Sequence, residues 1–182
     1  MKSFRSLILM LLSVLLLSTM LNAQGLMSIG VRIQKTPNLY YENGLALDYH
    51  SSELWKNRIH LGASYTSSRL GSALGSNALK QDNILLSTGL KFRQGKTIMP
   101  IVGFNLGYFM VDTEFEIFSM LPNSSLLLST EFGVGIDIYE SVSFQTTVGY
   151  NLITGDGVDG PGTLYPIFLN FTTLYELGGV EK

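Results

Sequence analysis

Two histidines are the residues best suited to chemistry in this chain of 182 residues, which holds no other histidine and no cysteine. His50 and His60 lie close in sequence to Ser51 and Ser52, and a serine activated by an imidazole base is a common nucleophile. Such a site needs the serine and the base within hydrogen-bond reach, and a third group that orients the base. Both histidines fall on the sequence positions that would face the interior of a β-barrel. We therefore expect them to form interior hydrogen bonds, and we predict no catalytic residues.

Other ionisable residues also fall on the alternate sequence positions that would face the interior of the barrel. With the histidines, the set is Arg32, Glu42, Asp48, His50, His60, Lys91, Arg93, Glu131, Asp137 and Glu176. Charges in a narrow interior persist only when they are paired, so we predict ion pairs that fill the lumen. Judged by their positions along the predicted strands, Lys91 and Arg93 should lie at one end of the barrel. Their expected partners there are Asp48, Asp137 or Glu176. Glu131 should lie nearer the middle. A path or site for a small polar solute is the alternative.

Metal and nucleic-acid chemistry find little support in the composition. The absence of cysteine excludes disulfides and thiolate zinc sites. The segment Asp156–Gly160 has the composition of a calcium loop, but it lacks the regular oxygen-ligand spacing and the terminal glutamate of an EF-hand. The net charge is −2, only 14% of residues are charged, and no basic stripe is present, which argues against a nucleic-acid partner. We predict no metal site and no cofactor.

The stretch from Leu126 to Leu152 shows the pattern that would position these side chains. Apolar residues, with Thr130 and Thr146, occupy every second position up to Ile138 and again from Val142, and glycine, serine, threonine and asparagine fill most positions between them. A period of two is the signature of a β-strand with unlike faces. The tripeptide 139–141 would make the reversal, so the stretch predicts one long β-hairpin.

The class of protein depends on which face of these strands lies inside. In a soluble barrel the large apolar residues would fill the core, and the other face would carry many lysines and glutamates. Here the other face is small and polar. The interior of an eight-stranded barrel is just wide enough for side chains, so we place the small, polar set inside and the large apolar set against lipid.

The same alternation recurs along the chain and predicts an all-β fold, an eight-stranded antiparallel up-and-down transmembrane β-barrel over residues 24–182. The strands are expected near residues 27–33, 41–50, 59–66, 84–93, 102–110, 126–138, 142–152 and 167–176. Residues 68–81 are predicted to be a long loop. Residues 1–23 are predicted to be a cleaved signal peptide, because Lys2 and Arg5 precede a short apolar run and Ala23 offers a small residue for cleavage.

Connections and aromatic residues give this strand count independent support. Connections one, three, five and seven are generally longer or richer in glycine and proline than two, four and six, as in barrels with long outer loops and short periplasmic turns. With both termini periplasmic, tyrosines gather at the ends of the strands, as in aromatic girdles. The predicted outer girdle is Tyr40, Tyr41, Tyr65, Tyr108, Tyr150 and Tyr165, and the periplasmic girdle is Tyr49, Trp55, Phe92, Tyr139 and Tyr175.

In this architecture the chain resembles the small eight-stranded outer-membrane barrels of the OmpA-transmembrane, OmpX and OmpW kind. The resemblance covers essentially all of the mature chain and rests on architecture, since no motif selects one subfamily. It implies an integral protein of a Gram-negative outer membrane, with membrane lipid, lipopolysaccharide and the barrel-assembly machinery as partners. One departure is the C-terminus. Such barrels usually end on an aromatic residue recognised during assembly, whereas here Tyr175 is followed by residues 176–182.

These patterns predict a non-enzymatic barrel with a structural or surface-interaction role, whose outer loops meet an extracellular ligand. Two alternatives stay open. One is a channel for small solutes or hydrophobic compounds. The other, more remote, is a lipid-modifying enzyme, since some outer-membrane barrels hydrolyse lipid acyl chains with a serine and a histidine.

Overall fold

The computed structural model describes residues 25–37, 41–51, 58–71, 77–92, 98–113, 124–153 and 167–177. These residues form eight strands: β1 (Gly25–Lys35), β2 (Tyr41–Ser51), β3 (Ile59–Gly71), β4 (Asn77–Lys91), β5 (Ile98–Thr113), β6 (Ser124–Tyr139), β7 (Val142–Ile153) and β8 (Ile167–Leu177). Within these ranges, no helix is long and apolar enough to cross a membrane.

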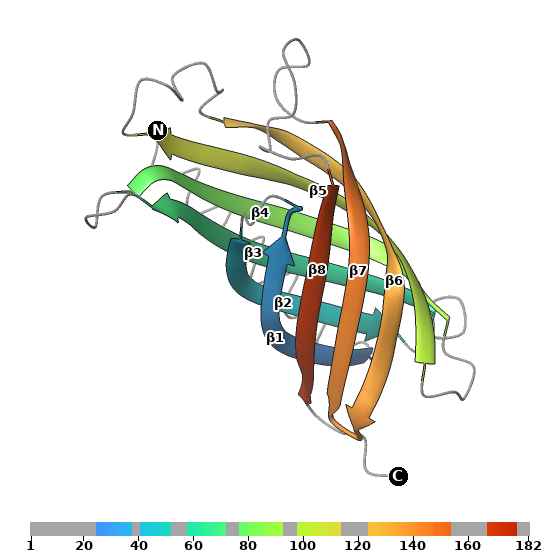
Figure 1. Ribbon diagram of the computed structural model, residues 1–182. Helices are drawn as coiled ribbons and strands as arrows, with labels where there is room; N and C mark the ends of the chain where they lie inside the picture. The colour runs from blue at the N-terminus through green and yellow to red at the C-terminus, as the bar shows by residue number, and fades with distance from the viewer. Residues whose placement is uncertain are drawn as a thin grey trace, which may run out of the picture.

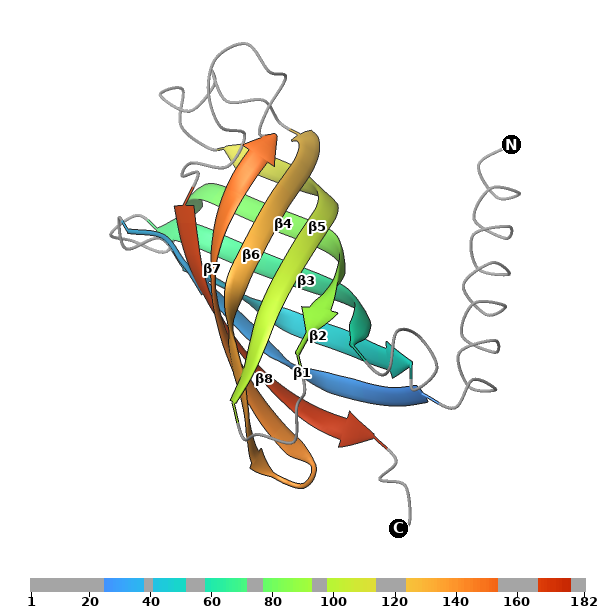
Figure 2. The ribbon, with the colours of Figure 1, turned by 90° about the vertical axis from the view of Figure 1, so that its right-hand side faces the viewer.

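Each strand pairs antiparallel with its neighbours in sequence, and β1 pairs with β8 to close the barrel. Figure 1 shows strongly tilted strands that wrap around one axis. Figure 2 shows the tight β6–β7 hairpin at the lower end. Closure matters energetically because it leaves no strand edge with unpaired backbone groups, a requirement for β-structure in lipid. We call the end of the barrel that holds Gly25 and Leu177 the terminal end, and the opposite end the distal end.

Side-chain exposure confirms the predicted assignment of the two faces. The large apolar residues of the alternating set point outward, and Leu45, Leu86 and Phe132 are 60%, 62% and 60% exposed. The intervening polar residues are buried in the lumen. So large an apolar surface cannot face water without a large unfavourable free energy, whereas against lipid tails it costs nothing. The outer surface therefore faces hydrocarbon.

Tyrosines lie at both ends of this apolar belt, as predicted. At the distal end Tyr41, Tyr65, Tyr108 and Tyr150 are exposed on the outward face, and at the terminal end Tyr139 and Tyr175 are exposed. The Tyr65 hydroxyl donates to Asp82 at 2.9 Å, and the Tyr108 hydroxyl donates to Ser124 at 2.7 Å. Rings that contact hydrocarbon while their hydroxyls bond to polar groups are typical of a membrane interface.

The predicted long loop at residues 68–81 is wrong in extent. Strand β3 continues to Gly71 and β4 begins at Asn77, so the connection shrinks to residues 72–76. The length asymmetry of the connections accordingly holds only in part, because the distal connection 72–76 is no longer than the terminal connection 92–97. Strands β5 and β6 span 16 residues each, more than the roughly 9–11 that cross a bilayer. In β5 the last five residues follow Tyr108, so this strand extends past the distal set of tyrosines.

Several predictions concern residues outside the described ranges. They are the signal peptide at 1–23, Ser52, Trp55, Arg93, Tyr40, Tyr165, the segment 156–160 and the C-terminal residues 178–182.

Candidate functional site

The polar lumen is the candidate functional site, and three buried carboxylates organise it. Glu42 and Asp48 come from β2, and Glu131 comes from β6. All three are at most 7% exposed, because the period of two turns every second side chain of these strands inward. Each carboxylate accepts hydrogen bonds from several strands, and we name each cluster after its carboxylate.

The Glu131 cluster joins strands that are not adjacent in the barrel. Arg32 Nη2 on β1 lies 2.7 Å from Glu131 Oε1, although β7 and β8 separate β1 from β6. Asn105 of β5 donates to the same oxygen at 2.5 Å, and Thr147 of β7 donates to Oε2 at 2.6 Å. Asn170 of β8 donates to Oε2 at 3.3 Å. One carboxylate thus ties four other strands to β6.

The Asp48 cluster lies toward the terminal end. Lys91 Nζ of β4 donates to Asp48 Oδ2, and His60 Nδ1 of β3 lies 3.1 Å from Oδ1. His50 Nε2 lies 3.6 Å from Oδ2. His50 and His60 face each other in the β2–β3 register, with ring centroids 6.1 Å apart. The carboxylate therefore has one lysine and two imidazoles around it.

The His60 ring depends on a glycine in the neighbouring strand. Gly89 is the β4 partner of His60, and a Cβ built on it would lie 2.4 Å from His60 Nε2. The same Cβ would lie 2.4 Å from the backbone oxygen of Val102. A side chain at position 89 would therefore displace the imidazole from Asp48, because the backbone on the other side cannot yield.

The Glu42 cluster, nearer the distal end, contains neutral donors. Thr66 Oγ1 and Asn83 Nδ2 donate to Glu42 Oε2 at 2.8 and 2.7 Å. Gln81 Nε2 lies 3.5 Å from Oε1 and donates to Asn83 at 3.0 Å. Among the described residues, no lysine, arginine or histidine forms an ion pair with Glu42.

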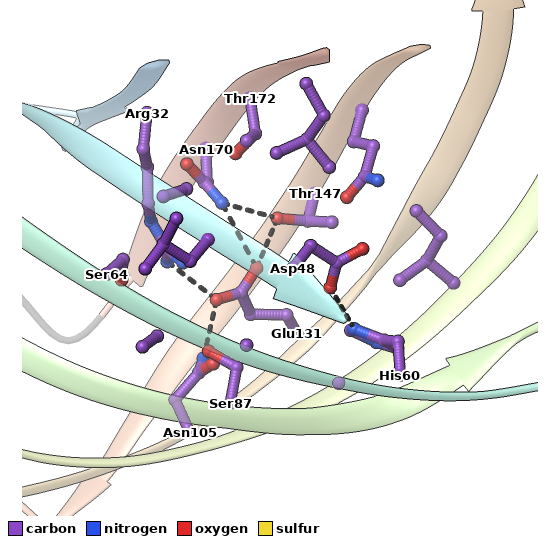
Figure 3. Close-up of a pocket in the computed structure, with 18 residues that line it drawn as sticks. Arg32, Asp48, His60, Ser64, Ser87, Asn105, Glu131, Thr147, Asn170 and Thr172 are labelled. Carbon is purple, nitrogen blue, oxygen red and sulfur yellow. Dashed lines mark hydrogen bonds and ion pairs between the residues drawn. The ribbon is translucent and has the colours of Figure 1, made fainter. Parts of the chain in front are cut away.

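A cavity of about 60 Å³ lies between the Asp48 and Glu131 clusters. Figure 3 shows Arg32, Asn105, Thr147 and Asn170 converging on Glu131, with the Asp48–His60 pair to one side. Large buried apolar side chains complete the packing of the lumen, and two of them, Ile101 and Leu174, line the cavity. The whole set is Leu85, Met99, Ile101, Phe109, Leu127, Phe168 and Leu174, each at most 4% exposed.

The predicted ion pairs are confirmed in part. Lys91 pairs with Asp48, one of its three expected partners, and Glu131 lies in the middle of the lumen as expected. The predictions did not include the Arg32–Glu131 pair or the Glu42 cluster. Gln81 falls within the predicted loop, and Arg32 reaches its partner only through the curvature of the closed barrel. Met99, Ile101, Leu127 and Leu174 also point inward, which the predicted small, polar interior did not include.

The geometry of the histidines supplies one of the two contacts that a nucleophilic site needs. Asp48 supplies the group that could orient His60, but His60 Nε2 has no hydrogen-bond partner among the described residues, so no described serine hydroxyl pairs with it. The side chains of Ser51 and Ser52 lie outside the described part of the structure. Among described residues, no group of three or more acidic or histidine side chains is arranged to hold a metal ion.

Comparison with known proteins gives a fold but no sequence family. No family model matches the chain, and no curated protein matches it in sequence. Among solved structures, the chain is similar to the N-terminal β-barrel domain of Pseudomonas aeruginosa OprF, with a TM-score of 0.58 and 9% identity over 85% of this chain and 98% of that one. It is similar to outer membrane protein H (OprH) from P. aeruginosa, with a TM-score of 0.54 and 12% identity over 84% and 99% of the two chains.

The outer membrane enzyme PagL is also similar, with a TM-score of 0.51 and 12% identity over 82% of this chain and 98% of that one. The fold is therefore that of small eight-stranded outer-membrane barrels, as predicted. Because an enzyme shares this fold with proteins that are not described as enzymes, the fold alone does not decide the activity.

Proposed function

We propose that the protein is a non-enzymatic barrel of a bacterial outer membrane, which anchors its distal connections at the cell surface. The observation that carries the proposal is the packed lumen. Phe109 is fully buried, Glu42 and Lys91 are 2% exposed, and these residues block the lumen at different heights. A barrel that transported ions would need a continuous water-filled path, and paired charges at successive heights oppose one.

Location in the outer membrane is supported by two independent features. The apolar belt between two sets of tyrosines fits a bilayer, and only closed barrels or helices span one. The similarity to small outer-membrane barrels fits the same location. The expected partners are membrane lipid and lipopolysaccharide around the belt, the assembly machinery during insertion, and an extracellular ligand at the distal connections.

The absence of catalysis is supported by the surroundings of His60. His60 is 8% exposed, and its partner Asp48 is already paired with Lys91. A lipid ester in the membrane would have to cross the barrel wall to reach it. Purified protein in vesicles of outer-membrane lipid should release no fatty acid, and His60→Ala should behave as the parent does. Release that the substitution abolishes would assign an enzyme.

Conductance across a planar bilayer tests the packed lumen. The parent protein should show no steady conductance. The charged side chains of the Asp48 and Glu131 clusters are already paired with one another, so an entering ion would meet no unpaired opposite charge there. Arg32→Ala removes the longest side chain of the Glu131 cluster. If this variant conducts at all, its conductance should be higher than that of the parent. A steady conductance in the parent would support the alternative, a small-solute channel.

Cysteine labelling tests the surface role, since the chain contains no cysteine of its own. Single cysteines at Ser72 and Gly157 belong to distal connections, and one at Gly95 belongs to a terminal connection. An impermeant thiol reagent should label the first two on intact cells and should not label the third. Labelling confined to Gly95 would place the distal connections in the periplasm.

A further inference from the structure

The central cavity has the composition of a binding site rather than of a packing defect. It lies between the Asp48 and Glu131 clusters, and its volume is about 60 Å³. A cavity needs roughly 10–15 Å³ to hold one water, so this one has room for about four waters or for one small organic molecule. Polar residues on β1, β3 and β8 line it, among them Arg32, Ser64 and Asn170.

Four polar atoms of the residues that line the cavity have no hydrogen-bond partner among the described residues. They are Arg32 Nε, His60 Nε2, Ser64 Oγ and Asn170 Oδ1, and their residues are 5%, 8%, 8% and 4% exposed. The Arg32 nitrogen can only donate, the amide oxygen of Asn170 can only accept, and the Ser64 hydroxyl can do both. A buried polar atom without a partner is costly, so together these atoms favour an occupant that both accepts and donates hydrogen bonds.

The charges around the cavity favour an uncharged occupant. Asp48 is paired with Lys91, and Glu131 is paired with Arg32, so both carboxylates that line the cavity are already neutralised. An ion that entered would lose its hydration without meeting an unpaired opposite charge.

The cavity adjoins a second hollow at the terminal end. This hollow of about 20 Å³ is lined by the β6–β7 turn, and it shares Asp48, Gln145 and Leu174 with the central cavity. On the distal side, Phe109 and the Glu42 cluster fill the lumen. Exchange would therefore pass Gln145 and Leu174.

We propose that the central cavity is a binding site for a small, uncharged molecule that donates and accepts hydrogen bonds, held by Arg32 Nε, Ser64 Oγ and Asn170 Oδ1 and exchanged through the terminal end. Water meets this description, and so does a solute the size of a simple amide. The site goes beyond the anchoring role and does not depend on it.

Cysteine accessibility tests the site, with Ser64→Cys as probe and Thr66→Cys as matched control. The two positions lie two residues apart on the inward face of β3, but Ser64 lines the cavity and Thr66, which is fully buried, belongs to the Glu42 cluster. The neutral reagent methyl methanethiosulfonate should modify Ser64→Cys at least ten times faster than Thr66→Cys, as measured by intact mass. Charged methanethiosulfonates should modify both slowly. Glu140→Cys, at an exposed turn, should react with the neutral and the charged reagents alike.

Magnetic resonance of the parent protein in micelles identifies the occupant without any substitution. The side-chain amide protons of Asn170 should show cross-peaks to water, and those of Asn83 in the Glu42 cluster should show none. Acetamide is the probe for a larger solute. If it shifts the Asn170 signals and removes their water cross-peaks, the site accepts organic amides, and if the cross-peaks persist, the site is for water alone. Either result supports a neutral polar site.

Three outcomes would overturn the proposal. In folded protein, Ser64→Cys could resist the neutral reagent while Asn170 shows no cross-peak to water. Charged reagents could modify Ser64→Cys as fast as the neutral one, which would indicate an open ionic path. Thr66→Cys could react as fast as Ser64→Cys, which would mean that access comes from general opening of the barrel.

Discussion

Glu131 and Glu42 are the same residue type, each almost fully buried in one lumen, yet their surroundings differ in charge. Glu131 accepts from two asparagines and a threonine and is paired with the guanidinium of Arg32. Glu42 also accepts from an asparagine and a threonine, but among the described residues no lysine, arginine or histidine forms an ion pair with it. The neutral donors are thus common to both sites, and the guanidinium is the difference.

The two clusters also differ in the strands they connect. Thr66, Gln81 and Asn83 lie on β3 and β4, the strands that follow Glu42's own strand in the sheet. Short side chains can reach only along the wall. The longer arginine reaches from β1 to β6, past two intervening strands. The comparison teaches that the neutral cluster ties β2 to β3 and to the next strand along the wall, β4, whereas the ion pair reaches past two intervening strands.

Glu131→Gln should have the largest effect on stability. The substitution preserves volume but leaves the buried guanidinium of Arg32 without a counter-charge, which costs about 3–5 kcal/mol. Urea unfolding in lipid vesicles, followed by circular dichroism, measures the loss. A loss below about 1 kcal/mol would mean that water already screens this pair, and the contrast with Glu42 would disappear.

Adding Arg32→Met to Glu131→Gln should recover part of that loss. A buried ion pair replaced by uncharged side chains is often nearly neutral in stability, because the desolvation cost of both charges disappears. We expect a coupling free energy of about 1–3 kcal/mol in the double-mutant cycle. Strictly additive losses would show that Arg32 stabilises the barrel by packing alone.

Lys91→Met should cost less than Glu131→Gln, about 1–3 kcal/mol. Asp48 loses its lysine but retains His60 at 3.1 Å and His50 at 3.6 Å. Either imidazole can hydrogen-bond to the carboxylate, and a protonated one would also offset its charge. The same urea titration measures the loss, with Lys35→Met at the distal rim as a control expected to change stability little. A loss equal to that of Glu131→Gln would show that the imidazoles do not compensate.

Alternation in the sequence predicted all eight strands and both faces, because lipid and lumen impose opposite chemistry on alternate residues. Alternation did not predict the ends of β3 and β4 near Ser68 and Lys80. Beyond the lipid both faces of a strand are polar, so the contrast between apolar and polar positions disappears. Of the site, height along the strands limited the partner of Lys91 to Asp48, Asp137 or Glu176, and the structure has Asp48. The Arg32–Glu131 pair could not be predicted, because it depends on how the closed barrel brings β1 near β6. The central cavity depends on side-chain packing, which strand periodicity does not predict.

Glu42→Gln should have the smallest effect, about 1 kcal/mol or less. The amide oxygen of the new side chain can still accept from Thr66 and Asn83, and no cation is left without a partner. Because the same chemical change is made at both positions, the difference between Glu131→Gln and Glu42→Gln isolates the contribution of the guanidinium from that of the neutral donors. Both variants are measured in the same vesicles and at the same salt concentration. A loss at position 42 that matches the loss at position 131 would indicate that Glu42 has a cationic partner after all, and the distinction between a cross-barrel ion pair and a wall-bound neutral cluster would then fail.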